Sequence, residues 1–236
     1  MLGLGSGLNN AAVLSNVVTP GSISDLAFWF KNDTNVTAGR WDDSSGNSNH
    51  MAQSTSGEQA SVSGGGLLFV DDNNDHYDLT TAVNIGGSRA FTMICVMNLN
   101  SYDSQNMILG DNNESDKFLE MQSADQMRFR QTGTAAVYKF AESGNFPLST
   151  TYMITVTKDT SRNIVIYKNG SVLEQESSTG VPVADGVFSV DQIGGRGINP
   201  DRDFDGHIYE LLLYTKLLSA EELSGVHSEI QARIGF

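Results

Sequence analysis

Short apolar runs alternate with turn-forming residues along most of the chain. From about Ile23 onward, runs of strand length are separated by clusters of Asp, Asn, Gly and Ser. Many short strands between such turns are typical of an antiparallel β-sandwich. The predicted strands cover residues 26–30, 66–70, 91–99, 106–109, 117–121, 126–131, 152–158, 163–168, 188–193 and 207–214.

Within several of these runs the side chains alternate between two faces. Ile164 and Ile166 fall on one side of an extended strand, and Val165 and Tyr167 fall on the other. This period of two suits an antiparallel strand that buries one face and exposes the other to water. The runs 152–158 and 163–168 are separated by four turn-forming residues and predict a hairpin.

A single segment near the C-terminus has a helical pattern. Ser219 precedes two acids, and its hydroxyl can accept a hydrogen bond from a free N–H group of the first helical turn. Apolar residues then recur at helical spacing and form one stripe. They are Leu223, Val226, Ile230 and Ile234.

The order of several short motifs resembles a known family. These motifs are the apolar strand 26–30, the turn that follows Trp41, the hairpin 164–170, and the strand 204–211 with the helix start after it. Together they resemble the concanavalin A-like lectin/glucanase superfamily, which includes laminin-G-like modules, over about residues 23–236. The resemblance implies an all-β, antiparallel jelly-roll β-sandwich with a short C-terminal helix. Members of this family are sugar-binding modules, glucanases or adhesive modules, so the fold does not define the function.

Residues 1–22 form a separate region that is rich in Gly and cannot bury a core of its own. The region lacks Lys and Arg before Thr19 and breaks its apolar content with Gly and Asn, so we expect no signal peptide. The start Met1–Gly5 resembles that of small virion proteins of tailed phages. That likeness implies an extended arm that docks on other virion proteins of an oligomer or larger assembly. The expected location is then the virion, after synthesis in the host cytoplasm.

Charge and hydropathy exclude several classes of partner. The 28 acidic and 14 basic residues give a net charge of -14, which repels nucleic acids and anionic membrane surfaces. No stretch approaches the roughly 20 apolar residues that cross a bilayer. The single cysteine, Cys95, lies inside an apolar run and predicts a buried thiol.

The glucanase members of the family suggest one catalytic test. Their Glu-x-Asp-x-x-Glu motif is most nearly matched by residues 114–120, which contain one residue too many. On a strand, Glu114 and Glu120 would lie about 20 Å apart, whereas a retaining pair needs roughly 5–5.5 Å. The sequence therefore predicts a protein that is not an enzyme.

Acidic turns provide candidate metal ligands. Residues 201–206 imitate the start of an EF-hand loop, but the twelfth position is Leu212 instead of a bidentate Glu, which excludes an EF-hand. Two interpretations stay open: a calcium site in which two loops meet, or ordinary solvated turns. The candidate calcium ligands are Asp71, Asp72, Asp75, Asp201 and Asp203.

Aromatic residues provide candidate sugar contacts, because ring faces combine with Asp and Asn hydrogen bonds in sugar recognition. The candidates are Trp41, Tyr102 and Tyr138, and packing beneath its own turn is the competing role for Trp41. The main hypothesis is a non-enzymatic virion module, either a capsid decoration or a tail or fibre component, with cell-surface glycans as candidate ligands. The alternatives are a free carbohydrate-binding module and, third, a β-glucanase.

Overall fold

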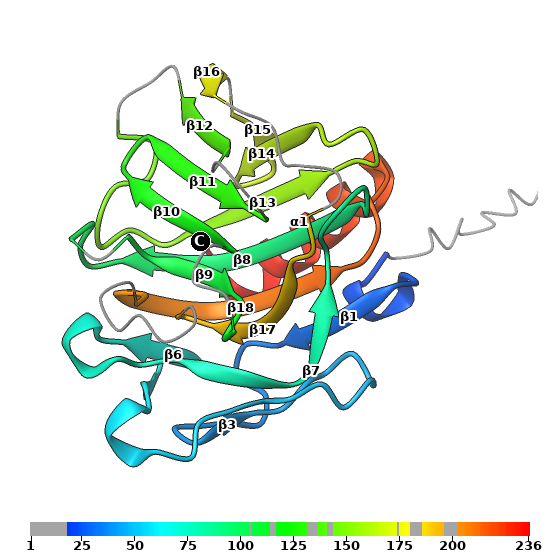
Figure 1. Ribbon diagram of the computed structural model, residues 1–236. Coiled ribbons are helices and arrows are strands. Elements are labelled where there is room, and N and C mark those ends of the chain that lie inside the picture. Colours follow the sequence, from blue (N-terminus) through cyan, green and yellow to red (C-terminus); the bar gives the residue numbers. More distant parts are fainter. Residues whose placement is uncertain are drawn as a thin grey trace, which may run out of the picture.

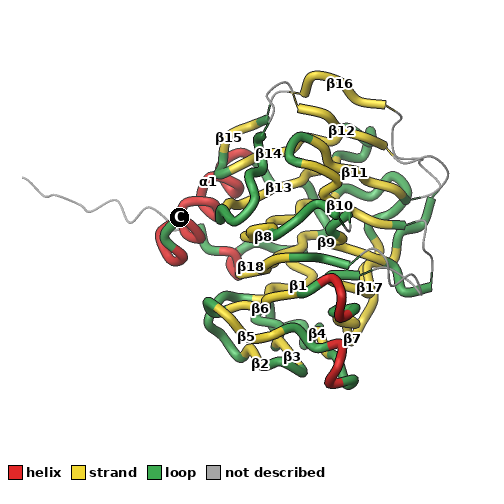
Figure 2. Tube along the Cα trace, turned by 90° about the vertical axis from the view of Figure 1, so that its left-hand side faces the viewer, coloured by secondary structure: helices red, strands yellow, loops and turns green. Residues whose placement is uncertain are grey.

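A computed structural model describes residues 18–103, 105–113, 117–131, 136–140, 144–173, 175–179, 186–195 and 203–236. For residues 72, 136–140 and 175–179 the description covers the backbone alone. The described elements form three layers, which Figure 1 shows from the front and Figure 2 from the side. A larger sheet lies in front, a smaller sheet lies behind it, and helix α1 (Ala220–Ile234) covers the back of the smaller sheet.

The smaller sheet is antiparallel and has eight strands in the described part of the chain. Strand β1 (Leu26–Phe30) pairs with β18 beside the main path of the sheet. The other strands follow the order β15 (Ser171–Val172), β14 (Ile164–Lys168), β13 (Tyr152–Lys158), β8 (Phe91–Leu99), β18 (Gly206–Tyr214), β6 (Gly66–Phe69) and β5 (Ser61–Ser63).

The larger sheet is also antiparallel, with ten strands among the described residues. Their order is β16 (Gln175–Thr179), β12 (Ala136–Phe140), β11 (Gln126–Arg130), β10 (Phe118–Ser123), β9 (Met107–Gly110), β17 (Ser189–Ile193), β7 (Tyr77–Asn84), β4 (Met51–Ala52), β3 (Arg40–Trp41) and β2 (Val36–Thr37). Short 3₁₀ turns occur at Pro20–Ser22, Ser56–Glu58 and Asp71–Asn73.

Strand β8 explains how the layers are joined. Its residues Met93 and Cys95 belong to the core between the two sheets, whereas Ile94 and Val96 belong to a second core under helix α1. Successive side chains on a strand point to opposite faces. Since both faces are covered, β8 is apolar almost throughout, and the Cys95 thiol is buried as predicted.

Helix α1 begins where the sequence predicts it. The Ser219 hydroxyl accepts a hydrogen bond from the Glu222 N–H (3.2 Å), and the Ser219 N–H donates to the Glu222 carboxylate (2.8 Å). This capping box pairs donors that the first helical turn leaves free. The buried residues Leu223, Val226 and Ile230 then face the smaller sheet.

A buried ion pair fixes the helix to the sheet. The Glu210 side chain on β18 is fully buried, and Arg233 of α1 donates two hydrogen bonds to its carboxylate (2.6 and 2.7 Å). The indole N–H of Trp29 donates a third hydrogen bond at 2.7 Å. Glu210 therefore has a structural role in joining β1, β18 and α1.

The predicted fold class is confirmed: an antiparallel sandwich of two sheets with one C-terminal helix. The hairpin of β13 and β14 is confirmed as well, with Val156 opposite Ile166. The edge strands β2, β5 and β15, which have only two or three residues each, were not predicted. No helix within the described ranges is long and apolar enough to cross a membrane.

Candidate functional site

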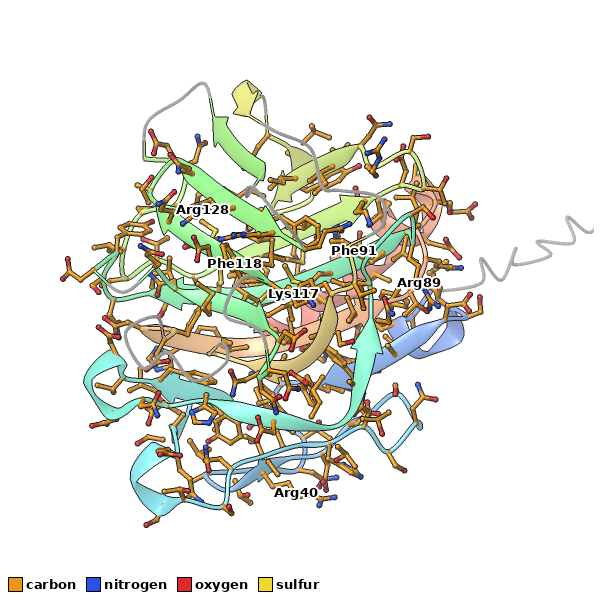
Figure 3. All side chains as sticks on the ribbon, viewed as in Figure 1. Arg40, Arg89, Phe91, Lys117, Phe118 and Arg128 are labelled. Atoms are coloured by element: carbon orange, nitrogen blue, oxygen red, sulfur yellow. The ribbon has the colours of Figure 1, made fainter. Side chains whose placement is uncertain are left out.

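The outward face of the larger sheet carries a charged cluster. On β10 and β11, Leu119, Met121, Met127 and Phe129 belong to the core between the sheets. The residues that alternate with them therefore lie on the opposite face of the sheet. Those residues are Phe118 and Glu120 of β10 and Arg128 of β11. Phe118 and Arg128 are labelled in Figure 3, which views the larger sheet from the front.

Arg128 is held from two sides. Glu120 lies directly opposite it on the neighbouring strand, and Arg128 Nη1 donates to Glu120 Oε1 at 2.6 Å. The guanidinium carbon lies 5.2 Å from the centre of the Phe118 ring, within the range of a cation–π contact. Glu120 is fully buried, whereas 18% of the Arg128 side chain is exposed.

The position of Arg128 leaves donors for a ligand. A guanidinium has five N–H groups in a rigid planar fork. Of the three guanidinium nitrogens of Arg128, Nη1 alone donates a hydrogen bond to a described residue. We define the outward face around Phe118, Glu120 and Arg128 as the Arg128 face.

An acidic cluster lies one strand away from the Arg128 face. Gly110 of β9 pairs with Phe118 on one side and with Gln192 of β17 on the other. Beside Gln192, the Asp191 carboxylate accepts a hydrogen bond from the Asn112 N–H at 2.6 Å. Burial raises the pKa of Asp191, and the nearby carboxylates Asp111 and Asp78 add to this effect. In the larger sheet, strand β9 separates β17, which carries Asp191, from β10 of the Arg128 face.

Trp41 does not present a ring face to a ligand. Its side chain is fully buried, packs against Phe30 at a centroid distance of 6.0 Å, and donates from its indole N–H to the Lys31 carbonyl at 3.2 Å. The structure thus corrects its assignment as a sugar-stacking residue. Trp41 and Arg40 form the two-residue strand β3, and successive side chains on a strand point to opposite faces. Arg40 is exposed on one face, so Trp41 points to the buried face.

The two tyrosine candidates lie in different regions. Tyr102 follows β8 and is half-buried, and its hydroxyl donates to the carbonyl of Phe146. Burial raises the pKa of Tyr102 to about 12. Tyr138 lies in β12, and its side chain is outside the described part of the chain. Neither residue belongs to the Arg128 face as described, and a ligand role for them stays a prediction.

The structure brings two of the predicted acidic loops together at Gly194 and Gly195. A Cβ atom at Gly194 would lie 3.4 Å from the Asp75 carbonyl, and one at Gly195 would lie 3.5 Å from Asp203 Oδ1. Asp75 and Asp203 are each only 1% exposed. The predicted proximity of the 71–75 loop and residue 203 is therefore present in the fold.

The donor set at these loops gives a mixed result for calcium. Asp75 Oδ1 and Gln192 Oε1 are buried acceptors to which no described residue donates a hydrogen bond, and such hard oxygens suit calcium. Within the described ranges, however, no group of three or more His, Cys, Asp or Glu residues could hold a metal. Asp71 lies in a 3₁₀ turn, while Asp201 and the Asp72 side chain lie outside the described residues. The calcium site stays a prediction.

Replacing Asp75 by Asn tests whether its charge is compensated. Burial raises the pKa of Asp75 and outweighs the hydrogen bond from the Val70 N–H. The carboxylate therefore costs stability as pH rises from its unfolded-state pKa of about 3.9 through the raised folded-state value. With a chelator present, we expect Asp75→Asn to melt at a higher temperature than the wild type at pH 7, and at the same temperature below pH 3.

Calcium titrations of the same two proteins complete the test. Calcium that raises the melting temperature of the wild type but not of Asp75→Asn would indicate an ion bound at Asp75. A lower melting temperature of Asp75→Asn in chelator at pH 7 would contradict the uncompensated charge.

Comparison with known proteins identifies the family to which the chain belongs. The profile of the concanavalin A-like lectin/glucanases superfamily matches residues 71–224, which is more than half of the chain. The matched range contains most of the larger sheet, including the Arg128 face, and the start of α1. Comparison with curated protein sequences found no significant match.

Two solved structures have similar folds at low identity. A Trypanosoma rangeli sialidase in complex with sialic acid is 15% identical with a TM-score of 0.55, and the match covers 90% of this chain and 34% of the sialidase. The binding domain of Paraclostridial Mosquitocidal Protein 1 is 15% identical with a TM-score of 0.58, covering 91% and 53% of the two chains. This chain thus spans about a third of the sialidase length. At such identities the likeness is one of fold, and together with the matching profile it shows that the chain belongs to the concanavalin A-like lectin/glucanases superfamily.

Proposed function

We propose that the protein is a non-catalytic carbohydrate-binding module that contacts glycans with the Arg128 face. Three findings support the proposal. The chain belongs to a superfamily of lectins and glucanases, one structure of similar fold contains sialic acid, and another is the binding domain of a toxin. The phage context predicted from the N-terminal residues is a separate hypothesis and does not enter this proposal.

The observation that carries the proposal is the arrangement of Arg128. Sugar hydroxyl groups are recognised by planar polar groups held in fixed positions on a rigid scaffold. Glu120 and Phe118 hold the guanidinium in one orientation, and its remaining N–H groups are available to hydroxyl or carboxylate oxygens. The acceptors around Asp191 can take hydrogen bonds from the sugar hydroxyls one strand away.

The pairing of Glu120 favours binding over hydrolysis. Glu120 is the only acid of the predicted glucanase string whose side chain the structure describes, since residues 114–116 lie outside the description. Its carboxylate is committed to a charge-assisted hydrogen bond with Arg128. A glycosidase would instead use such a group to protonate or attack the glycosidic bond.

A glycan array tests the proposal with one substitution and a matched control. We expect Arg128→Gln to reduce array binding at least about tenfold, because each lost charge-assisted hydrogen bond contributes roughly 1.5–3 kcal/mol. Arg40→Gln should bind like the wild type. Arg40 is 52% exposed, is ion-paired to Asp42, and lies at the far end of the same sheet, as Figure 3 shows.

A double variant separates binding from folding. Arg128→Gln removes the Arg128 cation from the buried Glu120 carboxylate, and loss of one partner of a buried ion pair by itself destabilises a protein. Glu120→Gln/Arg128→Gln removes both charges and should fold while it still fails to bind. Wild-type binding by the folded double variant would refute the Arg128 face, and a wild type that binds no glycan would refute the function.

A further inference from the structure

A pocket of about 380 Å³ lies between helix α1 and the hairpin of β14 and β15. Figure 2 shows the helix beside this hairpin, and a hydrogen bond from Gln231 Nε2 to the Asn169 carbonyl (3.3 Å) joins the two. The volume falls within the range of small-molecule sites, about 300–1,000 Å³. We refer to this cavity as the His227 pocket, after a buried residue of α1 that lines it.

His227 is anchored on the side that faces the smaller sheet. The residue is only 5% exposed, and its Nε2 lies 2.8 Å from the Thr155 hydroxyl of β13. Burial lowers the pKa of His227 to about 4, so the imidazole is neutral at pH 7. Thr155 is also buried, and His227 is the one described partner of its hydroxyl. Because a buried hydroxyl normally donates its single proton, Thr155 donates to Nε2, and the imidazole proton lies on Nδ1.

The Nδ1–H group of His227 lies on the pocket side. Gly170 lines the pocket, and a Cβ atom at Gly170 would lie 3.4 Å from His227 Nδ1. The φ of Gly170 is 85°, a conformation that favours glycine, so the turn passes the imidazole without a side chain between them. Within the described part of the chain, the ring makes its hydrogen bond through Nε2 alone. Nδ1 therefore presents a donor to the pocket.

The remainder of the pocket wall is polar but uncharged. Its described residues include no acid, Lys or Arg. The Tyr167 ring and the Leu223 side chain add apolar surface, which suits the C–H face of a sugar ring. Hydroxyl and amide groups both donate and accept hydrogen bonds, as sugar hydroxyls do, whereas an ionised ligand would be buried here without a counter-ion. These hydroxyl and amide groups belong to Asn169, Ser171, Ser224, Ser228 and Gln231.

From this arrangement we propose that the His227 pocket is a second ligand site, which takes one neutral sugar residue and donates from His227 Nδ1–H to a sugar oxygen. Helix α1 lies behind the smaller sheet, whereas the Arg128 face belongs to the larger sheet in front (Figure 1). The two sites share no residue. The inference therefore goes beyond glycan binding at the Arg128 face and does not depend on it.

Histidine NMR signals test the proposal in the full chain. Of the four histidines, only His227 is among the described lining of the pocket, so His50, His76 and His207 are internal controls. The probes are the neutral methyl glycosides of glucose, galactose, mannose and N-acetylglucosamine. At least one should shift the imidazole signals of His227 in a saturable manner, while glucuronic acid, which carries a carboxylate, should not. No shift with any neutral glycoside, or an equal shift with glucuronic acid, would overturn the proposal.

Two neighbouring positions on β15 provide a blocking variant and its control. Ser171 lines the pocket and Val172 does not, because successive side chains on a strand point to opposite faces. Both residues are exposed, so tryptophan at either position should leave thermal unfolding unchanged. Ser171→Trp should abolish the His227 shift, and Val172→Trp should keep it. A shift that persists in Ser171→Trp would contradict a site in this pocket.

The variant Glu120→Gln/Arg128→Gln separates the two proposed sites. It should lose binding to the glycan array and keep the His227 shift, because the residues of the Arg128 face do not line the pocket. A His227 shift lost in this folded variant would tie the signal to the Arg128 face and would overturn the second site.

The donor role of His227 has its own test. His227→Phe/Thr155→Val replaces both partners of the buried hydrogen bond by apolar groups, which can be nearly neutral for stability. By calorimetry, we expect this variant to bind the glycoside that shifts the wild-type signal about tenfold more weakly, the effect of one lost hydrogen bond. Wild-type affinity in the folded variant would refute His227 as the donor.

Discussion

Arg233→Met should lower the free energy of unfolding by about 3–5 kcal/mol, the range for removal of one partner from a buried ion pair. Among the described residues, the substitution leaves the fully buried Glu210 carboxylate with the Trp29 indole N–H and the Asn32 N–H as donors. Because α1 is joined to β18 through this pair, both the helix and the smaller sheet should lose stability together. Urea-induced unfolding followed by circular dichroism measures the difference.

Lys216→Met is the matched control. Lys216 is paired with Glu222 at 2.8 Å, but both side chains are about a quarter exposed. Partly exposed pairs contribute only about 0–1 kcal/mol. Glu210→Gln/Arg233→Met should recover part of the loss, since it removes the uncompensated charge. If Arg233→Met lowers the free energy of unfolding no more than Lys216→Met does, the buried Glu210 carboxylate does not need Arg233 to stabilise it.

Trp41→Ala should also lower the free energy of unfolding by about 3–5 kcal/mol, because it opens a cavity in the core between the sheets. Trp41→Phe should cost less, roughly 1–3 kcal/mol, since it mainly removes the donor to the Lys31 carbonyl. Urea-induced unfolding followed by circular dichroism distinguishes Trp41→Ala from Trp41→Phe. Val172→Ala, at an exposed edge position, should change stability by less than about 0.5 kcal/mol.

Glycan binding by Trp41→Phe tests the corrected role of this residue. If Trp41 serves packing alone, the folded variant should bind the array like the wild type. If Trp41→Phe loses glycan binding while its stability changes little, Trp41 contacts the glycan directly, which would contradict its burial.

Local signals were sufficient to predict much of the fold. The alternation in β14, the apolar run of β8 and the capping box at Ser219 each involve residues close in sequence. Among the strands that were not predicted, β2, β3 and β4 have two residues each, too short for a periodic pattern. They form because neighbouring strands supply their hydrogen-bond partners.

The candidate site was less predictable because it depends on register. Glu120 faces Arg128 only in the observed pairing of β10 with β11, which contains an irregularity between Met121 and Ser123. The opposite charges on either side of a short turn were the available signal, but a shift of one residue would separate them. Asp75 and Asp203 approach the adjacent glycines Gly194 and Gly195 from loops far apart in sequence, and their clustered acids were the available signal.

The virion role stays a prediction from the N-terminal composition. Residues 1–17 lie outside the described part of the chain, and the family includes proteins of several functions. The structure describes the chain from Val18, which lies beside Gly225 of helix α1.

The short outer strands of the two sheets affect how copies of the protein can associate. An outer strand with unpaired N–H and C=O groups is a template on which another chain can extend the sheet. Among the outer strands of the described sheets, β2, β5 and β15 have only two or three residues. A template of this length offers too few hydrogen bonds to recruit a neighbouring strand, so the protein is protected from fibre-like polymerisation at three of these edges.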